Sequence, residues 1–75
     1  MGADADEAMR WRKDFGIRVR SLRTARGISQ MTLAHEVGLH PTYISSIERG
    51  VRNVSLVNIH VLARGLGVRP HELLS

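Results

Sequence analysis

The sequence contains no cysteine among its 75 residues, which excludes disulfide bonds and thiolate metal sites. It has no apolar run near the roughly 20 residues that span a membrane, and its polar start, MGADADEAMRWRK, lacks the pattern of a signal peptide. Strand-like alternation of polar and apolar residues is missing as well. These absences predict an all-α protein, and a cytoplasmic location is expected.

Acidic residues are few, and they are unevenly placed. There are 7 of them against 11 Lys and Arg, and the formal net charge is +4. Three of them stand in the first seven residues, so residues 8–75 hold all 11 basic and only four acidic residues, a net charge of +7. A basic body can be ordinary soluble surface. In a single small domain, this excess and its arginine-rich make-up favour a polyanionic partner, with nucleic acid first.

The histidines do not form a catalytic or metal-binding group. His35 and His40 flank a segment that superficially resembles a zinc-protease signature, but the spacing is one residue too long. Gly38 also interrupts the helix, so the two rings would not share a face. No glycine-rich phosphate loop or nucleophile–base pair is present. The sequence therefore predicts no enzyme, no cofactor and no metal.

The central stretch of the chain, SQMTLAHEVGLHPTYISSIERG, predicts two short helices joined by a tight turn. Ser29 can cap the first helix, at about residues 30–37, and Pro41 suits the first position of the second, at about residues 41–49. Gly38 is free to adopt the positive φ of the turn. The second helix would have a polar outer face of Thr42, Ser45, Ser46 and Arg49. This is the outline of a DNA-binding helix-turn-helix.

A long first helix is predicted from about Ala8 to Arg26, because apolar residues recur there at spacings of three and four. Trp11 and Phe15 fall on that stripe, which makes them core or subunit-contact residues rather than platforms for stacked bases. Residues 1–7 are expected to be disordered, or at most a frayed helix start.

A fourth helix is predicted after Ser55, and a short fifth helix over residues 71–74. The fourth is apolar nearly all round, because Val57 and Val61 lie outside its main stripe. In so small a chain the second apolar side is expected to face another subunit. The predicted dimer surface consists of Val57, Val61, Leu73 and Leu74.

Residues 15–74 resemble the phage-repressor (Xre-type) helix-turn-helix family, through the pattern LR…GIS-Q…LA…VG…YIS-IERG…SL…LA…LGV. The compact size and the segment TYISSIERGVRNVSLVNI are similar to the controller proteins of restriction–modification systems. The resemblance implies a five-helix repressor-like DNA-binding domain at residues 15–75, with the helix-turn-helix at helices two and three. Residues 1–14 would form an acidic arm and the start of helix one.

The resemblance also implies a function. The chain would be a homodimeric transcriptional regulator that binds a pseudo-palindromic operator, with helix three in the major groove and helices four and five at the dimer interface. It would act on its own promoter and on a neighbouring restriction or other regulated gene. The implied partners are duplex DNA, a second copy of the chain and, as a further candidate, RNA polymerase.

Several residue roles follow from the resemblance. Gln30 would grip a backbone phosphate, Thr42 and Ser46 would face base edges, and Tyr43 would reach the sugar–phosphate backbone. Packing over the turn is an equal alternative for Tyr43. Short hydroxyls such as those of Thr42 and Ser45 allow close approach to the groove floor, but they discriminate weakly between bases. Without the surrounding motif, the serines would be interpreted as solvated helix surface.

Two arginines and their neighbours complete the implied site. Arg52 and Asn53 match a loop that approaches DNA in controller proteins. Arg52 is the strongest candidate for a bidentate guanine contact, with a solvated loop charge as the equal alternative. Arg49 is expected to meet phosphate or solvent. Arg23 and Glu48 match a structural ion pair.

The sequence departs from the family pattern at the start of helix three. Pro41 stands where relatives often carry a side chain able to touch bases, and His40 replaces the usual cap, which weakens this start unless the ring substitutes. The alternative to DNA binding is a protein-interaction module on the same fold, antitoxin-like or coactivator-like. The net charge and Arg52–Asn53 favour DNA.

Overall fold

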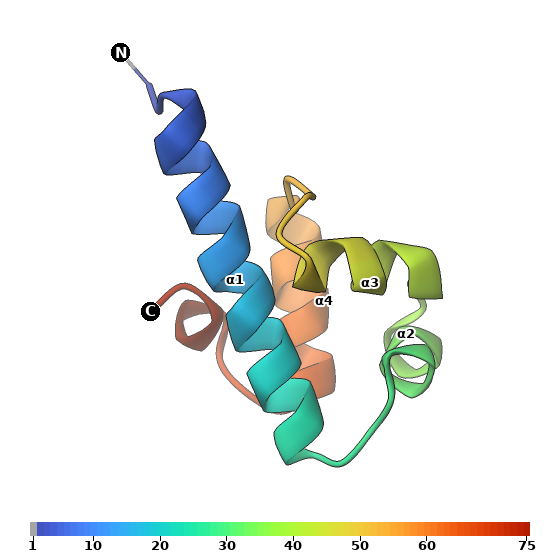
Figure 1. Ribbon diagram of the computed structural model, residues 1–75. Helices are drawn as coiled ribbons and strands as arrows, with labels where there is room; N and C mark the ends of the chain where they lie inside the picture. The colour runs from blue at the N-terminus through green and yellow to red at the C-terminus, as the bar shows by residue number, and fades with distance from the viewer. Residues whose placement is uncertain (1) are drawn as a thin grey trace.

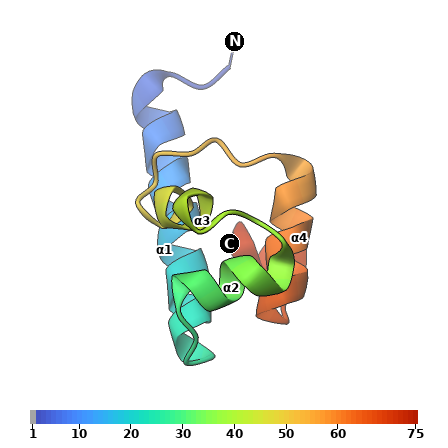
Figure 2. The ribbon, with the colours of Figure 1, turned by 90° about the vertical axis from the view of Figure 1, so that its right-hand side faces the viewer.

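The computed structural model describes residues 2–75, which form four α-helices, one short 3-10 helix and no strand. The helices are α1 (Ala5–Ala25), α2 (Gln30–Val37), α3 (Pro41–Glu48), α4 (Leu56–Leu66) and the 3-10 helix η1 (Pro70–Leu73). Figure 1 shows α1 running along the molecule, with α3 extending to one side of it and the C-terminal end of α3 beside α1. In Figure 2, α2 crosses below α3, and α1 and α4 stand on opposite sides. The all-α prediction is confirmed.

The first helix begins earlier than predicted, at Ala5 rather than about Ala8. The reason is a capping box: the Asp4 carboxylate accepts from the Glu7 N–H at 2.8 Å, and the Glu7 carboxylate accepts from the Asp4 N–H at 3.2 Å. The acidic residues therefore start the helix instead of forming a disordered arm. Met1, the first residue of that expectation, lies outside the described residues.

The prediction of a fifth α-helix is wrong. Residues 70–73 form a single 3-10 turn, in which N–H groups bond to carbonyls three residues back, as from Leu74 to His71 at 3.0 Å. Glu72 fixes the start of this turn, because its carboxylate accepts from the Arg69 N–H at 2.6 Å. A run this short completes the tighter 3-10 geometry more readily than an α-helical turn.

The core lies where α1, α2, α3, α4 and η1 meet. Its largest fully buried side chains are Val19, Leu33, Ile44, Ile47, Leu62 and Leu73. Phe15 joins this core, as predicted, but Trp11 is 54 % exposed. Trp11 lies on the helix face that was predicted to be buried, but α1 extends past the elements that pack on that face (Figure 1). Trp11 therefore lies beside the exposed Leu74 at the edge of the body.

Glycines allow α1 to approach the end of α3 closely. A Cβ at Gly16 would meet the Ile47 carbonyl oxygen and would lie 2.9 Å from the Glu48 carbonyl oxygen. Both are backbone atoms, so α3 as a whole would have to move. On the other side of the contact, Gly50 has φ +76° and would bring a Cβ within 2.7 Å of the Lys13 Cα. This contact fixes where α3 projects from the body.

Gly16→Ala is expected to lower the free energy of unfolding by about 1–3 kcal/mol, because the added methyl overpacks a backbone contact. This loss should appear although alanine is the better helix former by about 1 kcal/mol. Urea unfolding followed by circular dichroism measures the change. The matched control is Ser21→Ala, at an exposed position of the same helix, which should be neutral or slightly stabilising. A Gly16→Ala protein as stable as the parent would contradict the close approach.

Candidate nucleic-acid interface

The turn between α2 and α3 is built from three residues. Gly38 ends α2 in the left-handed region, with φ 74° and ψ 28°. His40 then caps α3, and its Nδ1 accepts from the Thr42 N–H at 3.1 Å. Pro41 occupies the first position of the helix, where no N–H is needed. The imidazole thus substitutes for the usual hydroxyl or carboxylate cap, and the start of α3 keeps a side-chain acceptor.

The outer face of α3 is polar. Thr42 and Arg49 are exposed, and Ser45 is half-buried. The Arg49 Nη1 donates to the Ser45 Oγ at 2.6 Å, so this serine is engaged by its neighbour one turn on. Thr42 and Arg49 are the side chains of α3 that lie most open to a ligand approaching this face.

Ser46 does not belong to that exposed face, and the prediction that it lies there is wrong. Only 4 % of the residue is exposed. Its Oγ donates to the Tyr43 carbonyl at 2.7 Å and accepts from the Arg52 Nε at 3.0 Å. The loop after α3 folds back over the helix and brings the Arg52 guanidinium onto Ser46. Ser46 therefore positions an arginine.

Arg52 belongs to a cluster that joins α3, the following loop and α4. Its guanidinium carbon lies 5.4 Å from the centre of the Tyr43 ring, at cation–π distance. The Tyr43 hydroxyl accepts from the Asn58 Nδ2 at 3.0 Å. Sequence reasoning missed Asn58, because this bond joins residues 15 positions apart. Asn53 is exposed beside this cluster.

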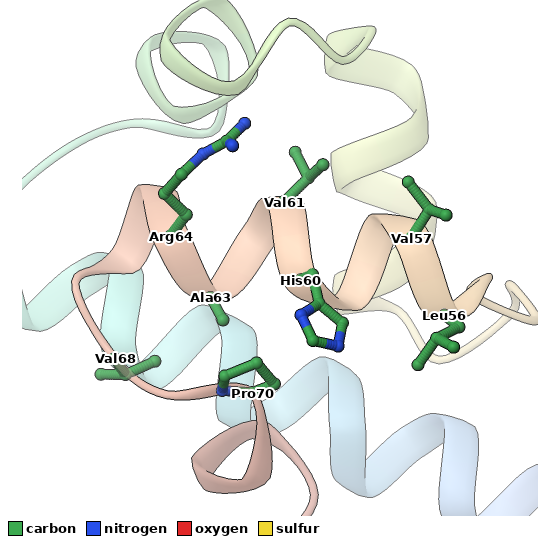
Figure 3. A pocket seen from close by; sticks show the side chains of 8 residues that line it. All are labelled: Leu56, Val57, His60, Val61, Ala63, Arg64, Val68 and Pro70. Atoms are coloured by element: carbon green, nitrogen blue, oxygen red, sulfur yellow. The ribbon is translucent and has the colours of Figure 1, made fainter.

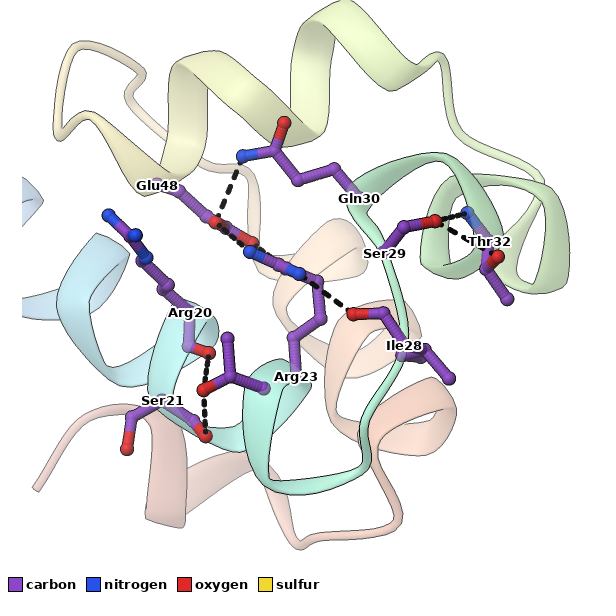
Figure 4. A network of polar contacts seen from close by, with 9 residues as sticks. Arg20, Ser21, Arg23, Ile28, Ser29, Gln30, Thr32 and Glu48 are labelled. Atoms are coloured by element: carbon purple, nitrogen blue, oxygen red, sulfur yellow. Dashed lines mark hydrogen bonds and ion pairs between the residues drawn. The ribbon is translucent and has the colours of Figure 1, made fainter.

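A second network holds the N-terminus of α2 against the end of α3. Arg23 and Glu48 form a two-bond ion pair, Nε to Oε2 at 2.6 Å and Nη2 to Oε1 at 2.9 Å. The remaining contacts come from Gln30, whose Nε2 donates to Glu48 at 3.0 Å, and from the Ile28 carbonyl, which accepts from Arg23 at 2.8 Å (Figure 4). The hydrogen bond to Glu48 raises the pKa of Arg23. The pair is largely buried, with side-chain exposures of 11 % and 3 %.

A separate apolar surface covers α4. Leu56 and Val57, which are adjacent in the first turn of α4, are 71 % and 70 % exposed. These residues line a hollow along α4, and Figure 3 shows Leu56 and His60 extending from one side of the helix and Val57 and Val61 from the other. Patches of adjacent exposed apolar residues mark interaction surfaces more often than isolated ones do.

The structure corrects the predicted dimer surface at its C-terminal end. Leu73 is 1 % exposed and fills the core of its own subunit, so it is not available to a partner. Leu74 is exposed but lines a different hollow, with Trp11 and Phe15. Val57 and Val61 thus remain as the predicted residues on the α4 surface.

Among residues 2–75, no three His, Asp or Glu side chains are grouped so that they could hold a metal ion. Within the same residues, no helix combines the length and apolar character needed to cross a membrane.

Comparison with known proteins identifies the family of this chain. The family model described as "Helix-turn-helix" matches residues 19–73. Control protein C.BamHI of Bacillus amyloliquefaciens is 54 % identical over 61 residues, covering 80 % of this chain and 75 % of the relative. The crystal structure of the restriction–modification controller protein C.AhdI from Aeromonas hydrophila superposes with a TM-score of 0.81 at 55 % identity, covering 83 % of this chain and 94 % of that one.

A third comparison includes the first turns of α1. The crystal structure of the hypothetical transcription factor NHTF from Neisseria superposes with a TM-score of 0.85 at 35 % identity. The superposition covers 100 % of this chain and 86 % of that one. The chain belongs to the Xre-type helix-turn-helix family of DNA-binding transcriptional regulators, and within that family it is similar to the controller proteins of restriction–modification systems.

Proposed function

We propose that the chain is a homodimeric regulator that binds a pseudo-palindromic operator with α3 of each subunit in a major groove. In this proposal α2 and α3 are the helix-turn-helix. The observation that carries it is the exposed polar face of α3, flanked by the Arg23–Glu48–Gln30 network at one edge and by the Tyr43–Arg52 cluster at the other. These two groups would hold donors ready on both sides of the helix.

The hydrogen bonds leave suitable donors free for backbone phosphates. Gln30 uses one amide hydrogen on Glu48 and keeps a second for a phosphate oxygen. The Tyr43 hydroxyl accepts from Asn58, so its own hydrogen can be donated to a phosphate. Contacts of this kind hold a protein in register on the duplex without reading sequence.

Base reading would rest on Thr42, Ser45 and Arg52, with Arg49 and Asn53 at its edge. The Arg52 Nε is bound to Ser46, which leaves the terminal guanidinium nitrogens for the paired acceptors of a guanine. The stack on Tyr43 holds this side chain in one region before DNA arrives. The role of Ser46 is thus changed from base contact to support of Arg52.

The paired half-sites would lie about one helical turn, or about 10 bp, apart, because the two-fold axis of the dimer fixes the separation of the two α3 helices. We propose that the operator controls the chain's own gene and a neighbouring restriction or other regulated gene, as the similarity to controller proteins suggests. Such a regulator, with no enzymatic activity, would work in the cytoplasm beside the chromosome, with RNA polymerase as a further candidate partner.

Arg52→Ala is expected to relax sequence choice, losing about 1–3 kcal/mol of discrimination at one base pair. Gln30→Ala should instead weaken binding to all duplexes by a similar factor. The experiment is selection of bound DNA from a random pool with each variant, starting with the parent, whose consensus gives the half-site and its spacing. An Arg52→Ala consensus identical to that of the parent would remove the base-reading assignment. No retardation of duplex DNA by the parent at low salt would favour the protein-binding alternative.

A further inference from the structure

Two basic side chains of α1 lie beside the end of α3, outside the groups described so far. Lys13 and Arg20 are seven residues apart, two turns of the same helix face. Lys13 stands against Gly50, whose added Cβ would lie 2.7 Å from its Cα and Cγ atoms. Figure 4 shows the Arg20 side chain extending from α1 toward the end of α3 that carries Glu48. Both side chains therefore flank α3 at its C-terminal end.

Neither side chain is neutralised within the chain. Both residues are exposed. The ion pairs formed by residues 2–75 are Arg23–Glu48 and Arg26–Glu36, and no side-chain hydrogen bond involves the Lys13 ammonium or the Arg20 guanidinium. Arg10, also exposed, continues the same helix face one turn toward the N-terminus. Asp6, exposed and seven residues before Lys13, adds a negative charge at the far end of this face, so the cations without a partner nearest α3 are Lys13 and Arg20.

We propose that Lys13 and Arg20 bind phosphates of the DNA strand beside the major groove that α3 enters. The inference rests on the proposed function and adds a second set of anchors, on α1, to those of Gln30 and Tyr43. Lys13 precedes residues 19–73, which the family model matches. These contacts would fix the angle of α3 in the groove, because α1 and α3 are held together rigidly at Gly16.

The test is the salt dependence of binding by Lys13→Gln/Arg20→Gln. Each phosphate contact contributes about 0.9 to the slope of log K against log salt concentration, so the variant should show a slope about 1.8 smaller than the parent. Sequence preference should be unchanged, because phosphate contacts carry no base information. Glutamine keeps the helix propensity of both positions, and circular dichroism confirms the fold of each protein.

The matched control is Arg18→Gln/Arg69→Gln, which removes the same charge from another side of the molecule. Arg18 faces the C-terminal segment, where its Nη2 donates to the Ser75 carbonyl at 3.0 Å, and Arg69 directly precedes η1. This control should keep the parent's slope. An equal loss in both variants would show a bulk charge effect and overturn the inference, as would an unchanged slope in Lys13→Gln/Arg20→Gln.

A second measurement keeps the test independent of the variants' folding. Neutral methylphosphonates are placed one at a time along the operator, and the parent's affinity is measured on each. Two or more positions beside the half-site should weaken the parent but not the Lys13→Gln/Arg20→Gln variant. Identical profiles would reject the contact. A parent that selects no sequence at all would instead reject the proposed function.

Discussion

Glu48→Gln is expected to lower the free energy of unfolding by about 3–5 kcal/mol, the usual effect of breaking one half of a buried ion pair. The substitution keeps the shape of the side chain but removes the counter-charge of Arg23 in a largely buried site, and it replaces one of the two acceptor oxygens with an NH2 donor. In a domain of this size the loss should lower the Tm by about 4–8 °C for each kcal/mol. Urea unfolding measures it as a shift of the midpoint at constant slope.

The chain offers a matched control for this prediction. Arg26 and Glu36 form an ion pair at 3.1 Å whose side chains are 38 % and 40 % exposed. Glu36→Gln should cost less than about 1 kcal/mol, because solvent screens the pair. The double variant Arg23→Met/Glu48→Gln should regain part of the loss, since the uncompensated charge is gone. Equal losses for Glu48→Gln and Glu36→Gln would show that burial does not determine the strength of the Arg23–Glu48 pair.

The elements of the fold that could be predicted are those that depend on local chemistry. Ser29 caps α2 through its Oγ, which accepts from the Thr32 N–H at 3.0 Å, and Gly38 ends the helix in the left-handed region, so both bounds of α2 follow from two residue types. Ser55 and Gly67 delimit α4 in the same way. The capping box at Asp4 was also readable from the sequence. The acidic composition of residues 1–7 favoured a disordered segment or a frayed helix start instead.

The parts that could not be predicted depend on which elements meet in space. The sequence predicts which face of α1 carries Trp11. It does not predict where along α1 the packing of the other helices ends. Ser46 is a polar residue that is nevertheless buried, and Arg52 returns over it to donate to its Oγ. Leu73 and Leu74 look alike in sequence, yet one turn of 3-10 geometry buries the first and exposes the second.

The sequence indicates which residues belong to the candidate site more readily than it indicates how they are arranged in space. The residue types of α3 and its loop indicate DNA contact, and the family resemblance assigns their order. The sequence did not reveal the hydrogen bonds that hold these side chains in place. Asn58 donates to the Tyr43 hydroxyl, and Gln30 donates to Glu48 of the Arg23–Glu48 pair. These bonds decide which donor of each side chain remains free. The roles proposed for Gln30 and Tyr43 therefore depend on long-range packing.

Val57→Asp is expected to convert the proposed dimer into monomers and to reduce operator affinity by about 10²–10⁴-fold, the loss that follows when two linked half-site contacts become independent. A two-fold interface contains the substitution twice, so two carboxylates would be buried without partners. The monomer should not suffer, because Val57 is 70 % exposed and an acidic residue in the first turn of α4 favours the helix dipole. Sedimentation equilibrium measures the subunit mass, and gel retardation measures the affinity.

The control is Met31→Asp, which places the same charge in the first turn of α2 at a residue that is 69 % exposed. It should leave the subunit mass of the parent unchanged. Val57→Asp monomers that keep the parent's circular dichroism spectrum and cooperative unfolding would place the subunit contact on the α4 surface, because folding would be intact while association was lost. An intact Val57→Asp dimer would move the contact elsewhere, and the hollow lined by Trp11 and Leu74 would then be the next surface to alter. The two positions of the interface predict different separations of the two α3 helices, so the half-site spacing of the selected operator decides between them independently of any substitution.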